Sequence, residues 1–139
     1  MRNYGARPFT ELSLLKPVPG FHGGEGMLKY RRLFDSDVFL TNWAYVDHLV
    51  IPIGGVDGKH WHGGVEEVYY VLSGRERVVV GDETAEIHTG DAVPVRLNEV
   101  HSFEYGAGGS GVDDFRDRNA EERLGHSTGF ARTANLAAS

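Results

Sequence analysis

The stretch Gly54–Gly74, GGVDGKHWHGGVEEVYYVLSG, decides how the rest of this chain is interpreted. It places His60 and His62 two positions apart, and a carboxylate pair, Glu66 and Glu67, follows shortly after. Because residues two apart in a strand share a face, both imidazoles are expected to point the same way. Two imidazoles beside a carboxylate suit a divalent transition metal. The stretch therefore predicts a metal centre built on β-strands.

The chain on either side of this stretch has the pattern of short antiparallel strands. Turn signals such as Gly81-Asp82 and Gly90-Asp91 separate the apolar runs, at a spacing of roughly eight residues. Strands are predicted over residues 27–34, 38–53, 66–72, 75–80, 83–87, 92–95 and 100–105. No segment between 27 and 105 has the periodicity of an amphipathic helix. The pattern indicates an all-β sandwich or barrel.

Composition narrows the classes of partner and chemistry. A chain of 139 residues is long enough for one domain with its own core. The net charge of −6 argues against nucleic acid or an anionic membrane as the main partner. The absence of cysteine excludes disulfides, iron–sulfur clusters and thiol catalysis. No apolar run has the length of a transmembrane helix, and the polar N-terminal segment does not look like a secretion signal, so a cytoplasmic location is expected.

Three regions are predicted along the chain. Residues 1–26 are expected to form an irregular arm, interrupted by proline and glycine, in which His22 lies in a mobile loop. Residues 27–105 are expected to form the barrel. Residues 106–139 are expected to be a poorly structured tail rich in glycine, alanine and arginine, with a short helix conceivable over 117–124.

The tail offers too few apolar residues for a buried strand. Two explanations for this lack of apolar residues stay open. Either the N-terminal arm closes the barrel in place of a strand from the tail, or the tail is the product of a late sequence change such as a reading-frame shift.

The histidine stretch and the segment after it resemble the two motifs of the cupin superfamily. The first motif, G-x5-H-x-H-x3–4-E-x6-G, is matched by Gly54, His60, His62, Glu67 and Gly74. The second, G-D-x4-P-x-G-x2-H-x3-N, is matched by Gly90, Asp91 and His101. This sequence departs from the second motif where proline, glycine and asparagine are usual, at Arg96, Asn98 and Tyr105. The resemblance implies an antiparallel jelly-roll barrel, with the motif core at residues 54–105.

The resemblance also implies a metal held by His60, His62, Glu67 and His101. Strand parity alone does not select the glutamate: Glu66 is in phase with His62, but Gly63-Gly64 can bulge the chain and reset the phase. The motif spacing favours Glu67. Such sites in relatives hold Fe, Mn, Ni, Cu or Zn, and the sequence does not choose among these cofactors.

Strand parity from the expected ligands predicts which residues line the pocket. By this parity Phe103 shares a face with His101, and Tyr69 and Val71 share one with Glu67. Two further candidates come from the preceding aromatic-rich strand: Tyr45, as a second phenol, and His48, for which the alternative is an ordinary sheet histidine. Tyr69 is a candidate catalytic residue, because a phenol there supplies a proton; the alternative is a plain aromatic wall. Arg96 is a second catalytic candidate that pairs with a substrate carboxylate; the alternative is a surface arginine.

The resemblance implies a metal-dependent enzyme that acts on a small organic substrate, by oxygenase or by isomerase or lyase chemistry. The alternative is a non-catalytic small-molecule-binding or sensory module. A homodimer is expected, because relatives commonly pair and because an edge strand at residues 27–34 needs covering. Trp61, which alternates with its histidine neighbours, is expected outside the barrel or at that interface.

Overall fold

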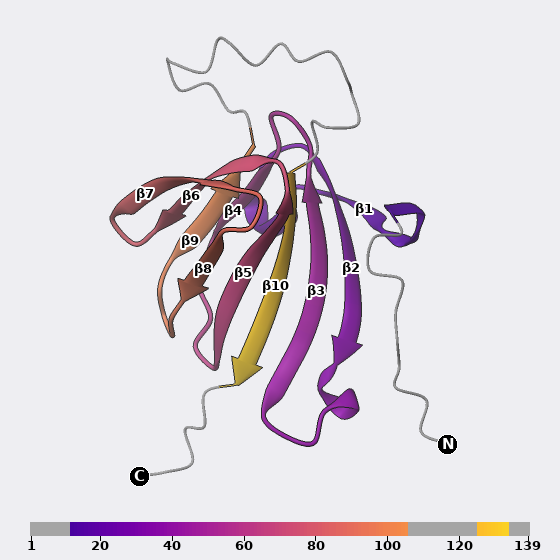
Figure 1. The fold of residues 1–139 in the computed structure, drawn as a ribbon. Helices are drawn as coiled ribbons and strands as arrows, with labels where there is room; N and C mark the ends of the chain where they lie inside the picture. Colours follow the sequence, from indigo (N-terminus) through magenta and orange to yellow (C-terminus); the bar gives the residue numbers. More distant parts are fainter. Residues whose placement is uncertain (1–11, 106–124, 134–139) are drawn as a thin grey trace.

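The computed structural model describes residues 12–105 and, for its backbone, the strand at 125–133. These residues form ten strands in two antiparallel sheets (Figure 1). The first sheet contains, in order, β1 (Lys16–Pro19), β2 (Met27–Asp35), β3 (Trp43–Ile51), β10 (Gly125–Thr133), β5 (Val65–Ser73) and β8 (Ala92–Val95). The second contains β4 (Val56–His60), β9 (His101–Glu104), β6 (Arg75–Val80) and β7 (Glu83–His88).

The remaining regular elements are three 3-10 turns: η1 (Leu12–Leu14), η2 (Phe21–Gly23) and η3 (Ser36–Val38). Within the described ranges, no helix is long and apolar enough to cross a membrane. The prediction of an all-β jelly-roll fold is confirmed.

The core lies between the two sheets and is built by strand alternation. In β5, Glu67, Tyr69 and Val71 are buried while their neighbours are more exposed, as the period of two requires. Phe103 of β9 is fully buried opposite them, with its ring centroid 4.3 Å from that of Tyr69. Full burial of a side chain such as Val71 or Phe103 stabilises a fold by about 1.5–3 kcal/mol. The same inward face carries both the core and, further along the strands, the histidines.

Strand β10 corrects the expectation that the chain after residue 105 is without strands. It lies between β3 and β5 and pairs with both, as Figure 1 shows in yellow. The segment GHSTGFART lacks apolar alternation, which is why the sequence pattern does not identify it. A central strand is held by hydrogen bonds on both sides, so its own propensity matters less. The helix considered over 117–124 lies outside the described residues.

The N-terminal arm also contributes to the sheet. β1 pairs with β2, so β2 lies inside the first sheet and not at its edge. Turn η2 then crosses to the second sheet, where Glu25 and Val56 exchange two backbone hydrogen bonds of 3.1 and 2.8 Å. The arm therefore packs against both sheets, although residues 1–11 lie outside the described ranges.

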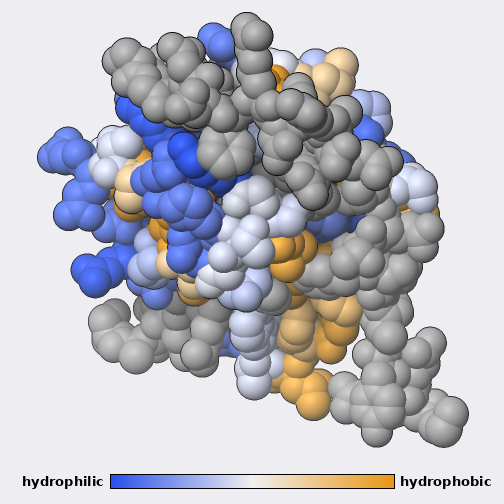
Figure 2. Space-filling view, turned by 45° about the horizontal axis from the view of Figure 1, so that its top comes forward, coloured by the Kyte–Doolittle hydropathy of each residue, from blue (hydrophilic) through white to orange (hydrophobic). Residues whose placement is uncertain are grey.

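The surface is unevenly polar. Figure 2 shows hydrophilic residues gathered on the left of the view and a hydrophobic patch lower in the centre. Trp61 is 60% exposed, which agrees with its expected place outside the core. Val68 and Tyr70 of β5 are also exposed, because they alternate with the buried Glu67 and Tyr69. The homodimer stays a prediction.

A buried carboxyl group interrupts the apolar core. Glu76 of β6 is only 1% exposed, and neither of its carboxylate oxygens has a hydrogen-bond partner among the described residues. Burial, together with the charge of the equally buried Asp57, raises the pKa of Glu76 to about 8. Glu76 is therefore protonated in the folded protein near neutral pH.

This buried acid predicts a stability that falls as the pH rises. In the unfolded chain the carboxyl titrates near 4.5, so between 4.5 and about 8 only the folded state keeps the proton. Stability is then lost progressively across that window, by on the order of 5 kcal/mol. The variant Glu76→Gln should flatten the dependence, measured as urea unfolding between about pH 5 and about pH 9. Parallel curves for the two proteins would contradict this assignment.

Candidate metal centre

Three histidines converge on the inner face at one end of the barrel. His60 ends β4, His62 lies in the loop that follows, and His101 begins β9. His60 and His101 are cross-strand partners in the second sheet. One ring nitrogen of each of the three imidazoles lies within 4.8 Å of the others. The histidine cluster is a group that can hold a metal ion.

Backbone carbonyls orient two of the rings. His60 Nδ1 donates to the carbonyl oxygen of Gly58 at 2.7 Å, and His101 Nδ1 donates to that of Glu99 at 2.9 Å. A proton on Nδ1 leaves the lone pair on Nε2, which is the arrangement found around metal-ligating histidines. Burial lowers the pKa of His60, so its ring is neutral at physiological pH. Both rings present an Nε2 lone pair as a ligand.

His62 is held in place by the turn that precedes β9. The backbone N–H of Asn98 donates to the His62 carbonyl at 2.9 Å. Asn98 adopts a left-handed conformation with φ of 63°, which asparagine tolerates better than most residues with a side chain. The chain before His101 thus fixes the loop that carries His62, which brings residues from the two motifs together.

The structure brings Glu67, and not Glu66, to the histidines. Glu67 is buried with one carboxylate oxygen 2.5 Å from His62 Nε2, whereas Glu66 is exposed. That contact lacks hydrogen-bond alignment, and Nε2 of His60 likewise has no partner among the described residues. Buried polar atoms are normally paired, and a cation between these groups would satisfy them. The donor set of imidazole nitrogens and one carboxylate therefore fits a divalent transition metal.

Two tyrosines contact the proposed ligands. The Tyr45 hydroxyl donates to Glu67 at 2.8 Å, and the Tyr69 hydroxyl lies 3.3 Å from His101 Nε2. Tyr45 reaches from β3 to β5 across β10, where the register puts Ala131 between Tyr45 and Glu67. Burial, followed by the charge of Glu67, raises the pKa of both phenols. Both keep their protons at neutral pH and act as hydrogen-bond donors.

The other candidate pocket residues differ in their relation to the histidines. Val71 and Phe103 are fully buried in the apolar core, and the ring centroid of Phe103 lies 6.4 Å from that of His101. His48 is 1% exposed, but strand alternation puts it on the opposite face of β3 from Tyr45, so its expected place in the pocket is corrected. The parity argument from the ligand strands does not extend to β3, whose phase is set separately by its pairing with β10.

Arg32, which sequence reasoning missed, lies against Tyr45, the tyrosine that donates to Glu67. Its guanidinium carbon lies 4.5 Å from the centre of the Tyr45 ring, and it donates to Asp47 at 2.9 and 3.3 Å. Arg96 is exposed in the connection before β9, where its backbone N–H donates to Glu99. The signal for Arg32 was its pairing with Asp47 across β2 and β3, which depends on a register that the sequence does not fix.

Comparison with known proteins agrees with this architecture. Residues 47–108 match the model of the cupin domain family, and that range contains all of the proposed ligands. The family match and the similar structures support membership of the cupin superfamily. Its two histidine-bearing motifs and its two-sheet jelly roll are both features of that class.

The individual proteins to which this chain is similar share little sequence identity with it. An uncharacterized protein of Methanocaldococcus jannaschii is 26% identical over 74 residues, which cover 53% of this chain and 59% of that protein. The chain therefore matches less than two thirds of that relative's length. A predicted oxalate decarboxylase of Thermotoga maritima has a similar structure, with a TM-score of 0.75 and 19% identity over 93% of this chain and 99% of that one. A cupin 2 conserved barrel domain protein of Salinispora arenicola CNS-205 has a TM-score of 0.63 and 16% identity, over 93% and 88% of the respective chains.

Proposed function

We propose that this chain is a metal-dependent enzyme that acts on a small organic substrate, by oxygenase or by isomerase or lyase chemistry. The observation that carries the proposal is the convergence of the three imidazoles, with ring nitrogens within 4.8 Å of one another, beside the buried carboxylate of Glu67. We infer that His60, His62, His101 and Glu67 hold one divalent ion. When bound, such an ion supplies Lewis-acid activation of a substrate oxygen or, if it is iron, reactivity towards dioxygen.

The chain's own residues give this site its selectivity. Tyr45 donates to Glu67 and so fixes the orientation of the carboxylate. Tyr69 is buried beside His101, and its raised pKa keeps the phenol protonated, so that it can donate a hydrogen bond to a substrate oxygen. The apolar side chains of Val71 and Phe103 lie on the same inward face and exclude water behind the tyrosine. These groups favour a small molecule with oxygen atoms at one end.

Small carboxylates are the first substrates to test. The similar structure from Thermotoga maritima is described as a predicted oxalate decarboxylase, which makes oxalate and related dicarboxylates a rational starting panel. Small diketones extend the panel, because two neighbouring oxygens can both reach one ion.

Reconstitution tests the proposal. The protein is stripped with a chelator, reloaded separately with Fe²⁺, Mn²⁺, Ni²⁺, Cu²⁺ or Zn²⁺, and assayed against the panel for product and for oxygen consumption. We expect turnover with at least one metal, its loss on stripping, and its return on reloading. The binding-module alternative predicts ligand affinity that survives metal removal and no turnover with any metal. That result would overturn the enzymatic proposal.

A further inference from the structure

We infer that His22, in turn η2 of the N-terminal arm, is a positioning residue for the proposed metal ligand His60. The imidazole ring of His22 stacks on that of His60, with the ring centroids 3.7 Å apart and the planes at 29°. This contact comes from a segment far outside both histidine motifs. The inference rests on the proposed metal site and deepens it.

A buried carboxylate fixes the His22 ring. His22 Nδ1 lies 2.6 Å from an oxygen of Asp57, whose side chain is 1% exposed. The same oxygen lies 3.7 Å from His60 Nδ1. Asp57 thus contacts both rings of the stack, and the bond between His22 and Asp57 restrains the ring that covers His60.

The backbone of the turn is built to bring His22 to this place. His22 has φ of 51° and ψ of 35°, a left-handed conformation that is uncommon for a residue with a side chain. Residues in such conformations persist where their surroundings hold them and often mark functional positions. Here the surroundings hold the ring over a proposed ligand.

Two glycines permit the close approach of the turn to β4. A Cβ atom on Gly24 would collide with the carbonyl oxygen of Val56, and one on Gly58 would collide with that of His22. On the other side of the turn, Phe21 contacts Tyr30 of β2 at a ring distance of 5.5 Å. Turn η2 therefore contacts both sheets and secures His22 between them. This explains the glycine-rich segment, which we expected to be a mobile loop.

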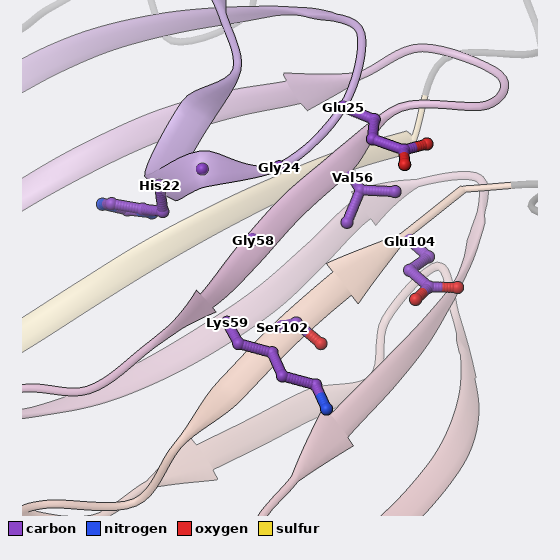
Figure 3. A pocket seen from close by; sticks show the side chains of 9 residues that line it. His22, Gly24, Glu25, Val56, Gly58, Lys59, Ser102 and Glu104 are labelled. Atoms are coloured by element: carbon purple, nitrogen blue, oxygen red, sulfur yellow. The ribbon is translucent and has the colours of Figure 1, made fainter.

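The neighbouring hollow does not account for the placement of His22. His22 itself borders this cavity of about 500 Å³ beside β4, together with residues that include Lys59, Ser102 and Glu104. Figure 3 shows the side chain of His22 turned away from the side chains of Lys59, Ser102 and Glu104. Lys59 and His60 alternate along β4, so the hollow and the histidine cluster lie on opposite faces. The His22 ring packs against His60, which belongs to the histidine cluster on the inner face.

Metal binding to His22→Gly tests this role, because glycine tolerates the left-handed backbone and keeps the turn. We titrate the stripped protein with Co²⁺, following its visible absorption, and measure Tm alongside. We expect Co²⁺ affinity to fall by about tenfold to 100-fold, with a changed absorption band and little change in Tm. His22→Phe, which keeps an aromatic ring for the stack, should recover part of the affinity. The exposed His88→Ala provides the matched control and should bind Co²⁺ as the wild type does.

The outcomes separate the two proposals. Wild-type affinity and an unchanged Co²⁺ band in His22→Gly would overturn the positioning role while leaving the metal site intact. If that variant does not fold, His22→Asn, whose side chain also tolerates the left-handed region, gives the same decision. Failure of the wild type itself to bind Co²⁺ would instead contradict the proposed metal site.

Discussion

Removal of residues 125–139 should unfold the protein. β10 lies between β3 and β5, and eight of its residues are in register with each neighbour. Its loss would leave one edge of β3 and one edge of β5 unpaired in the middle of the first sheet, although β2 and β8 still pair with their other edges. Each hydrogen bond contributes about 1 kcal/mol net to stability. The hydrogen bonds of the two lost ladders therefore account for a large part of a typical total stability of about 5–15 kcal/mol. Circular dichroism and a thermal melt should show no cooperative transition.

A point variant tests the same strand without truncation. Thr128→Pro removes one backbone donor from a strand that is paired on both sides, which a central strand does not tolerate. We expect a loss of stability of about 1–3 kcal/mol, because the partner of the missing donor is left unsatisfied. Thr128→Val, matched in size and branching, should fold normally, as should a chain shortened only by residues 134–139. A truncation at residue 124 that still melts cooperatively at the wild-type temperature would contradict the placement of β10.

The second large effect is expected on metal binding. His62→Ala and His101→Ala should each weaken binding by about 100-fold or more, because changes merely adjacent to ligands already cost 10–100-fold. His62 lies in a loop with its side chain 27% exposed, so its removal should leave the barrel folded. Metal retained after desalting, measured by elemental analysis, reports the effect. Full metal occupancy in His62→Ala would contradict the assignment of His62 as a ligand.

The adjacent glutamates provide a matched pair for the fourth ligand. Glu67→Gln should weaken metal binding strongly, since the carboxylate lies against His62 and accepts a hydrogen bond from Tyr45. Glu66→Gln makes the same chemical change one residue away on the exposed side of β5 and should bind metal normally. The reverse order would show that the motif spacing had selected the wrong residue.

Much of the fold was predictable because turn residues mark its hairpins clearly. The predicted strands at 75–80 and 92–95 begin and end where β6 and β8 do. Both are bounded by glycine turns with positive φ, at Gly74, Gly81 and Gly90. Local backbone chemistry of this kind can be read directly from sequence.

The missed elements depend on contacts between distant segments. β10 is a strand because β3 and β5 offer it hydrogen bonds on both sides, and its own sequence gives little indication. His22 reaches His60 through a turn that only its packing against β4 explains. Arg32 lies over Tyr45 because of the register between β2 and β3. The histidine motifs predicted which ligands to consider, but these neighbours became visible only with the pairing of the strands.

Titration of the stripped wild-type protein with a divalent metal tests the central proposal most directly. The ligand set of His60, His62, His101 and Glu67 predicts saturable binding of one ion per chain, with an affinity that falls as the pH drops and the imidazoles become protonated. Isothermal titration calorimetry with Co²⁺ or Mn²⁺, at two pH values, measures both quantities. One tight site per chain that is lost in His62→Ala is the expected result. The absence of saturable binding by either metal would contradict the proposed metal centre.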